Sequence, residues 1–140
     1  WPSIQTDNFH LNAFGFMNPE VGPYNLTDSD QVQVGGFLSD KNGSRAIQNA
    51  ECLECRLELD GRSAMSFRYK FTLPDGEIIH VKTGRKYAQT VNGLMRGEND
   101  AECLLDCYEG FFDFEVEETG ERGYGVAEYS IEPAYPRWRY

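Results

Sequence analysis

The feature that most constrains the fold of this chain is an alternation of apolar and polar residues with a period of two. The clearest instance is the stretch AMSFRYKF over residues 64–71, which places Met65, Phe67, Tyr69 and Phe71 on one face. Because successive side chains of a strand point to opposite faces, this pattern predicts a half-buried antiparallel strand.

Further segments show the same period and are separated by turn residues. Residues 73–77, with the sequence LPDGE, contain a proline that presets a turn and a glycine that tolerates positive φ, so they predict a hairpin. Helical periodicity is scarce, and its best short candidate is residues 99–108. The other predicted strands cover residues 9–16, 31–38, 52–59, 78–83, 85–91, 111–117 and 124–131.

These strands fill the chain and predict an all-β fold. About eight short antiparallel strands suit a small closed β-barrel, with a β-sandwich as the alternative. The length of 140 residues fits one domain over residues 1–140, and the two prolines of residues 133–140 predict an extended C-terminal tail. We expect the aromatic residues of the tail to pack on the barrel or on a neighbouring subunit.

Charge and hydropathy exclude several classes of partner. The net charge of −10 repels phosphate backbones, so nucleic acid is a poor candidate. No apolar run approaches the ~20 residues of a membrane-spanning helix, so no membrane insertion is expected. The glycosylation sequons at Asn25 and Asn42 and an even number of cysteines favour an oxidising compartment only weakly. We therefore predict a cytoplasmic protein, with secretion as the alternative.

The cysteines occur in two pairs, Cys52 with Cys55 and Cys103 with Cys107. In a regular strand, residues three apart project to opposite faces, so Cys55 is expected to point inward and Cys52 outward. This geometry and the absence of knuckle turns argue against a zinc site, and no metal is predicted. The alternatives are a disulfide from Cys55 to Cys103 or Cys107, or buried free thiols, which we favour.

Four residues are candidates for acid–base chemistry or for purely structural roles. His10 shares a mixed polar and aromatic face and could be a general base or a structural histidine. His80 is expected to point outward. Asp106 and Glu128 each lie among apolar neighbours, where a carboxyl group would have a raised pKa and could act as an acid, or could pair with an arginine.

The aromatic residues suggest a ligand. The chain has 9 Phe and 8 Tyr residues, and an eight-stranded barrel can leave room for one small molecule, or its rings can fill the interior completely. No phosphate loop, dinucleotide fingerprint, Gly-x-Ser-x-Gly elbow or His-Glu-x-x-His motif occurs, so no cofactor is predicted. The expected lining residues are Met65, Phe67, Tyr69, Phe112, Phe114 and Tyr124.

Three segments carry a family resemblance. The run GERGYGVAEY over residues 120–129 resembles the closing strand of lipocalin-like domains in the carotenoid 1,2-hydratase (hydroxyneurosporene synthase) and AttH-like superfamily, with a Gly-x-Gly-x-x-Glu-Tyr type pattern. Residues 34–37 and 71–77 are similar to strands in the middle of such domains, so the likeness covers about the last hundred residues.

The resemblance implies a lipocalin-like barrel that forms a homodimer or pairs with a second barrel domain. It also implies cofactor-free chemistry on terpenoid or polyketide-like substrates in an apolar cavity. Only Glu128 and Tyr129 match a family motif by position. The predicted function is binding of a small hydrophobic molecule and its isomerisation, cyclisation or hydration, the last a lyase reaction, with Glu128, Tyr129, Asp106 and His10 as the catalytic residues.

Two other functions stay open at the level of the sequence. One is a non-catalytic module that binds a small ligand or a carbohydrate through exposed aromatic residues. The other is a structural domain with a solid interior.

Overall fold

One antiparallel sheet of nine strands makes up the described part of the chain. The computed structural model describes residues 1–14, 35–96 and 103–131, with side chains for 1–14, 35–91 and 107–129. The strands are β1 (Pro2–Thr6), β2 (Phe9–Phe14), β3 (Gly35–Asp40), β4 (Gly43–Ala46), β5 (Asn49–Leu57), β6 (Ala64–Thr72), β7 (Ile78–Arg96), β8 (Cys103–Val116) and β9 (Arg122–Ile131). Their order in the sheet is β4-β3-β2-β1-β9-β8-β7-β6-β5.

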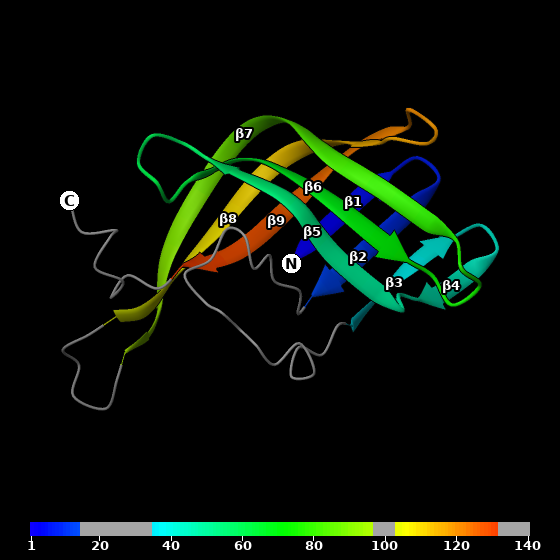
Figure 1. The fold of residues 1–140 in the computed structure, drawn as a ribbon, viewed down its shortest axis with the longest axis horizontal. Helices are drawn as coiled ribbons and strands as arrows, with labels where there is room; N and C mark the ends of the chain where they lie inside the picture. The colour runs from blue at the N-terminus through cyan, green and yellow to red at the C-terminus, as the bar shows by residue number, and fades with distance from the viewer. Residues whose placement is uncertain (15–34, 97–102, 132–140) are drawn as a thin grey trace.

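The sheet curls into a half-barrel, so that its two edge strands, β4 and β5, come near each other (Figure 1). The two-residue link between them, Ile47 and Gln48, is held on both sides. The amide of Ile47 donates to the Gly36 oxygen of β3 (3.0 Å), and the amide of Gln48 donates to the Thr72 oxygen of β6 (2.8 Å). An all-β, antiparallel, barrel-like fold is therefore confirmed.

The concave side of the sheet holds the hydrophobic core. Alternation places every second side chain of a strand on this side, as predicted for Phe67, Tyr69 and Phe71. The largest fully buried side chains are Tyr69, Phe71, Phe112, Phe114, Ile4, Leu11, Leu73, Val81 and Pro2. Aromatic rings thus fill much of the described interior.

Several predicted boundaries change. The helix expected over residues 99–108 is wrong from residue 103 onward, because Cys103 begins β8. The two strands expected at residues 78–83 and 85–91 are one strand, β7. Strands β1 and β4 were not predicted, because each is short and β4 consists of the largely polar residues GSRA. Residues 15–16, 31–34, 99–102 and 133–140, which carry other predictions, lie outside the described residues.

Two β-bulges overturn predicted side-chain directions. Leu53 is an extra residue between the pairs Cys52↔Tyr69 and Glu54↔Arg68, so Cys52 and Cys55 both pack against the core instead of facing opposite sides. Met65 is an extra residue on β6 opposite Arg56 and Leu57. The chain there turns Ala64 inward and leaves Met65 52% exposed, so its predicted place on the inner face is wrong.

Candidate functional site

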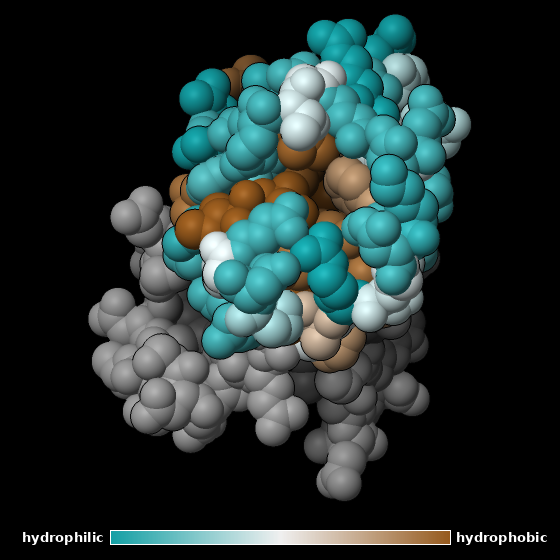
Figure 2. All heavy atoms as spheres, turned by 90° about the vertical axis from the view of Figure 1, so that its right-hand side faces the viewer, coloured by the Kyte–Doolittle hydropathy of each residue, from teal (hydrophilic) through white to brown (hydrophobic). Residues whose placement is uncertain are grey.

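Four hairpin turns meet at one end of the half-barrel and surround a hollow that we call the mouth. Figure 2 looks onto this end and shows an apolar floor ringed by hydrophilic side chains. The turns are those between β1 and β2, β3 and β4, β6 and β7, and β8 and β9. The hollow has a volume of about 510 Å³, within the range of small-molecule sites. Its floor consists of Phe9, Leu38, Ile78, Ile79 and Val116.

The rim of the mouth is acidic. Its charged side chains are five carboxylates and two cations, namely Asp7, Asp40, Glu77, Glu118, Glu121, Lys41 and Arg45. This composition gives the rim a formal charge of −3. A neighbouring positive charge, or a strong hydrogen-bond donor, would be stabilised there.

Arg45 connects the two sides of the mouth. From the edge strand β4, its guanidinium reaches Glu77 (2.7 Å) and Asp75 (3.2 Å) in the β6–β7 turn, and Asp40 on β3 (3.5 Å). The ion pairs with Asp75 and Glu77 join elements from opposite ends of the sheet order. Because Arg45 already has three acidic partners, it forms no ion pair with Asp7, Glu118 or Glu121 among the described contacts.

The turn between β8 and β9 is fixed against β7. The ring nitrogen Nδ1 of His80 lies 2.6 Å from Oε1 of Glu118, and the His80 amide also donates to this carboxylate (3.0 Å). Burial alone would raise the pKa of the Glu118 carboxyl, but these hydrogen bonds lower the pKa below its usual value. Glu118 therefore remains ionised at the rim at neutral pH. The predicted outward direction of His80, opposite Ile79 and Val81, is confirmed.

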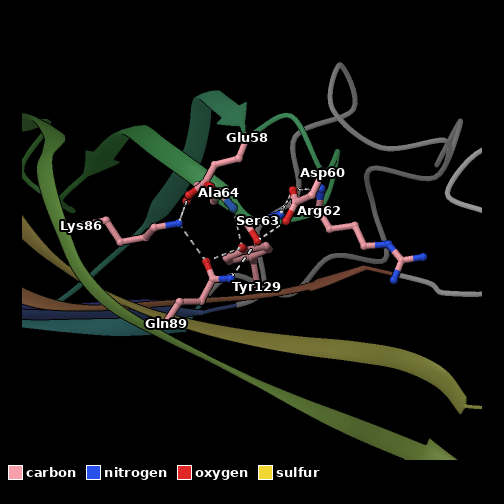
Figure 3. A network of polar contacts seen from close by, with 8 residues as sticks. All are labelled: Glu58, Asp60, Arg62, Ser63, Ala64, Lys86, Gln89 and Tyr129. Carbon is pink, nitrogen blue, oxygen red and sulfur yellow. Dashed lines mark hydrogen bonds and ion pairs between the residues drawn. The ribbon is translucent and has the colours of Figure 1, made fainter. Parts of the chain in front are cut away.

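A polar network surrounds Tyr129 at the β5–β6 turn (Figure 3). The hydroxyl of Tyr129 accepts a hydrogen bond from the Ala64 amide (2.5 Å) and donates to Oε1 of Gln89 (3.4 Å). Gln89 in turn donates to the Ser63 hydroxyl (2.9 Å), which donates to Asp60 (2.5 Å). The chain of contacts thus runs from β9 to β7 and on to the turn.

Lys86 supplies the positive charge of this network. Its ammonium group donates to the Ala64 oxygen (3.0 Å) and to Gln89 (3.2 Å), and it forms an ion pair with Glu58. Two strands, β8 and β7, separate β9 from β6 in the sheet. The hydrogen bond between Tyr129 and Ala64 therefore crosses the concave side and joins β9 to β6. The network thus stabilises the curvature of the sheet.

The environment of Tyr129 disfavours proton transfer at neutral pH. Burial raises the pKa of its hydroxyl well above the usual value, and the hydrogen bond from Ala64 opposes this shift in part. The hydroxyl also has a donor and an acceptor already in place. A structural role explains these contacts.

The structure does not bring the four predicted catalytic residues together. Tyr129 packs against the core, whereas His10 and Glu128 occupy the alternate, outward positions of β2 and β9. His10 lies 3.3 Å from the Ser3 hydroxyl and stacks edge-on against Phe37 (5.5 Å between centroids). Asp106 belongs to β8, but its side chain lies outside the described side chains.

The predicted ligand-binding residues also divide between the two faces. Phe67, Tyr69, Phe112 and Phe114 lie in the core, each at most 5% exposed, and pack in a connected series of ring contacts. Tyr124 is 60% exposed, on the same outer face as Val126. None of the predicted residues lines the mouth. Its lining comes from turns that sequence analysis treated only as connections.

The described cysteines form no disulfide with one another. Cys52, Cys55 and Cys107 are free thiols on or near the core, as favoured from the sequence, and the alternative bond between Cys55 and Cys107 is not formed. Burial raises the pKa of the Cys55 thiol to about 12, and the neighbouring Cys52 adds to the shift. Cys103 lies outside the described side chains. Among the side chains described, no three His, Cys, Asp or Glu residues are placed to hold a metal ion.

We expect Tyr129→Phe to lower the free energy of unfolding by about 1–3 kcal/mol, because it removes the acceptor of a partly buried amide. The matched control is Tyr124→Phe on the exposed outer face, where a change within about 0.5 kcal/mol is expected. Urea denaturation followed by circular dichroism measures both. Equal losses in the two variants would contradict the role assigned to the network.

Within the described residues there is no helix that has both the length and the apolar character needed to cross a membrane. Comparison with protein-family models, with curated proteins and with solved structures finds no match to the chain. The geometry of the described residues is thus the basis for a functional proposal.

Proposed function

We propose that this chain is a binding domain for a small amphipathic molecule, which it holds at the mouth of the half-barrel. The observation that carries the proposal is the hollow of about 510 Å³ with an apolar floor and a polar rim (Figure 2). An apolar body would contact Phe9, Ile78 and Ile79, and a polar group would face the rim. Burial of apolar ligand surface would provide most of the affinity, at roughly 25 cal/mol per Å².

The acidic rim favours a ligand whose polar group is cationic or donates hydrogen bonds. Asp7 is exposed, and among the described residues Glu121 accepts a hydrogen bond from the main-chain amide of Asn8 alone (3.2 Å). These two carboxylates can therefore pair with a cationic group or accept hydrogen bonds from a neutral donor. An anionic ligand would be repelled by the rim and by the net charge of −10.

The aromatic interior supports a ligand position at the mouth rather than deep in the half-barrel. Phe71, Phe112 and Phe114 are 0–1% exposed and occupy the space that a deeper ligand would need. His10 and Glu128 face outward and the Tyr129 hydroxyl is already hydrogen bonded, so these residues do not support the acid–base chemistry that the family resemblance implies. A lipocalin-like barrel remains a prediction. Such a barrel would bind a small, largely apolar molecule, which is the kind of ligand proposed here.

The apolar contact is tested with a fluorescent amine of suitable chemistry, dansylcadaverine. Ile78 lies on the floor and is 44% exposed, so Ile78→Ser removes apolar contact without opening the core. We expect its dissociation constant to rise about fivefold to tenfold, as for the loss of one to two buried methylene groups. Met65→Ser, at a 52% exposed outer position, is the matched control and should leave the constant unchanged.

The charge preference is tested with the same probe and its anionic counterpart, dansylglycine. The double variant Asp7→Asn, Glu121→Gln should weaken binding of the amine severalfold and strengthen binding of the anion. The double variant Glu51→Gln, Glu54→Gln, on the edge strand β5, changes the net charge by the same amount and is the control. The proposal is wrong if neither probe binds, or if the floor and control variants change the affinity equally.

A further inference from the structure

The outer face of β8 and β9 carries an unusual group of exposed side chains, which we call the outer patch. Three alternate cross-strand pairs, those whose side chains face outward, form it, in the order Tyr124↔Asp113, Val126↔Phe111 and Glu128↔Glu109. Tyr124, Phe111 and Val126 are 60%, 40% and 37% exposed. Apolar side chains gathered in this way on an outer face mark an interaction surface.

Strand β7 extends the outer patch with a third ring. Tyr87 is an extra residue between the pairs Lys86↔Phe112 and Ala88↔Phe111, and the bulge leaves its ring 52% exposed on the outer face. Its centroid lies 6.0 Å from that of Phe111, which in turn lies 6.4 Å from that of Tyr124. The rings are inclined to one another by 50° and 51°, so the surface that they form is not flat.

Two carboxylates at one end of the outer patch can attract a cation. Glu109 and Glu128 are directly opposite each other on adjacent strands, an arrangement in which like charges repel. The hydroxyl of Thr90 donates to Glu109 (3.5 Å), and the α-ammonium group of Trp1, which donates to the main-chain oxygen of Glu128, is also attracted by the Glu128 charge. No ion pair to a lysine or arginine side chain is found for either carboxylate among the described side chains. Aromatic rings beside an acidic pair complement an aromatic segment that carries arginine.

We propose that residues 133–140 of the same molecule dock on the outer patch. Their sequence, PAYPRWRY, combines two prolines, three aromatic residues and the two arginines Arg137 and Arg139. Proline-rich segments bind grooves lined by aromatic side chains, and arginine pairs with carboxylates and stacks on tyrosine rings. The basic residues of this segment therefore match the acidic pair, and its rings match Tyr87, Phe111 and Tyr124.

Distance along the chain favours docking within one molecule. Val126 precedes Ile131, the last residue of β9, by five positions, which corresponds to about 17 Å of strand. Eight residues can span about 25 Å when they are extended, which exceeds the length of strand between Ile131 and Val126. A segment tethered this closely has an effective concentration in the millimolar range.

Photochemical cross-linking of the full chain tests this inference. Tyr124→p-benzoylphenylalanine places a cross-linker in the outer patch, and mass spectrometry after irradiation should identify residues 133–140 as its main product. Phe37→p-benzoylphenylalanine, at a 40% exposed outer position on β3, is the matched control and should not give this product. Irradiation of mixed ¹⁴N- and ¹⁵N-labelled protein should yield products within one molecule only.

The acidic pair is tested in the same experiment. The double variant Glu109→Gln, Glu128→Gln should reduce the yield of the product roughly fivefold, and 0.5 M NaCl should do the same, because both weaken exposed ion pairs. Cross-links to another segment, or between two copies of the chain, would overturn the inference. A yield that is equal in the double variant and the parent would overturn it as well.

Discussion

Gly125→Ala is expected to lower the free energy of unfolding by about 3 kcal/mol or more, which corresponds to a fall of roughly 10 °C in Tm. A Cβ atom at Gly125 would lie 1.9 Å from the main-chain oxygen of Ser3 and 3.0 Å from the Cα of Ile4. Both neighbours belong to the backbone of β1, which pairs with β9 through Ser3↔Val126 and Ile4↔Gly125. Since no side chain can move aside, the two strands must separate and lose hydrogen bonds.

The matched control for this variant is Gly84→Ala on β7. A Cβ atom there would lie 3.3 Å from the Cβ of Asp113, a side-chain atom that can shift by a few tenths of an ångström, so a change under about 1 kcal/mol is expected. Thermal and urea unfolding monitored by circular dichroism would compare the two. Gly125→Ala as stable as Gly84→Ala would contradict the close approach of β1 to β9.

The same close approach explains part of the glycine-rich closing segment. A Cβ at Gly123 would lie 2.1 Å from the main-chain oxygen of Gln5. The lack of a side chain at both Gly123 and Gly125 therefore allows β1 to lie close to β9. The glycine motif is visible in the sequence but its partner strand is not, because β1 lies more than a hundred residues away and is only five residues long. Long-range pairing of this kind leaves no local signal in the sequence.

Local alternation predicted the fold class and the best strands correctly. Phe67, Tyr69 and Phe71 are buried as expected, and residues 73–77 form the turn of a hairpin in which the Leu73 amide donates to the Glu77 oxygen (2.9 Å). The errors at Cys52 and Met65 have one cause. Each bulge adds a residue to one strand and reverses the side-chain directions beyond it. Leucine and methionine are not characteristic of bulges, so the sequence does not indicate a bulge at Leu53 or Met65.

The mouth could not be predicted because it depends on the closure of the sheet. Its rim is assembled from four turns that are distant in sequence, and Arg45 joins β4 to the β6–β7 turn only because the curl brings the two edges together. Turn carboxylates such as Asp7 and Glu121 look like ordinary solvated residues in the sequence. Their shared position becomes evident only when the strand order is known.

Raising the pH from 9 to 12 is expected to destabilise the protein by several kcal/mol. Burial, with a contribution from Cys52, raises the pKa of Cys55 to about 12 from the 9.0 of an exposed thiol, and burial also raises the pKa of Tyr69 and of Tyr129. The unfolded chain therefore releases these protons first, so stability is fully present below pH 9 and falls as the pH rises toward 12. For Cys55 alone, three pH units set an upper bound of about 4 kcal/mol, which its partial exposure reduces.

The variant Cys55→Val separates this thiol from the tyrosines. Valine has a similar volume and no proton to lose, so the variant should keep most of its stability at pH 7 and lose less between pH 9 and pH 11 than the parent does. Urea midpoints measured at half-unit steps of pH under reducing conditions give the slope of stability against pH for the variant and for the parent. Identical slopes would mean that ionisation of the Cys55 thiol does not oppose folding, and its place against the core beside Cys52 would then be wrong.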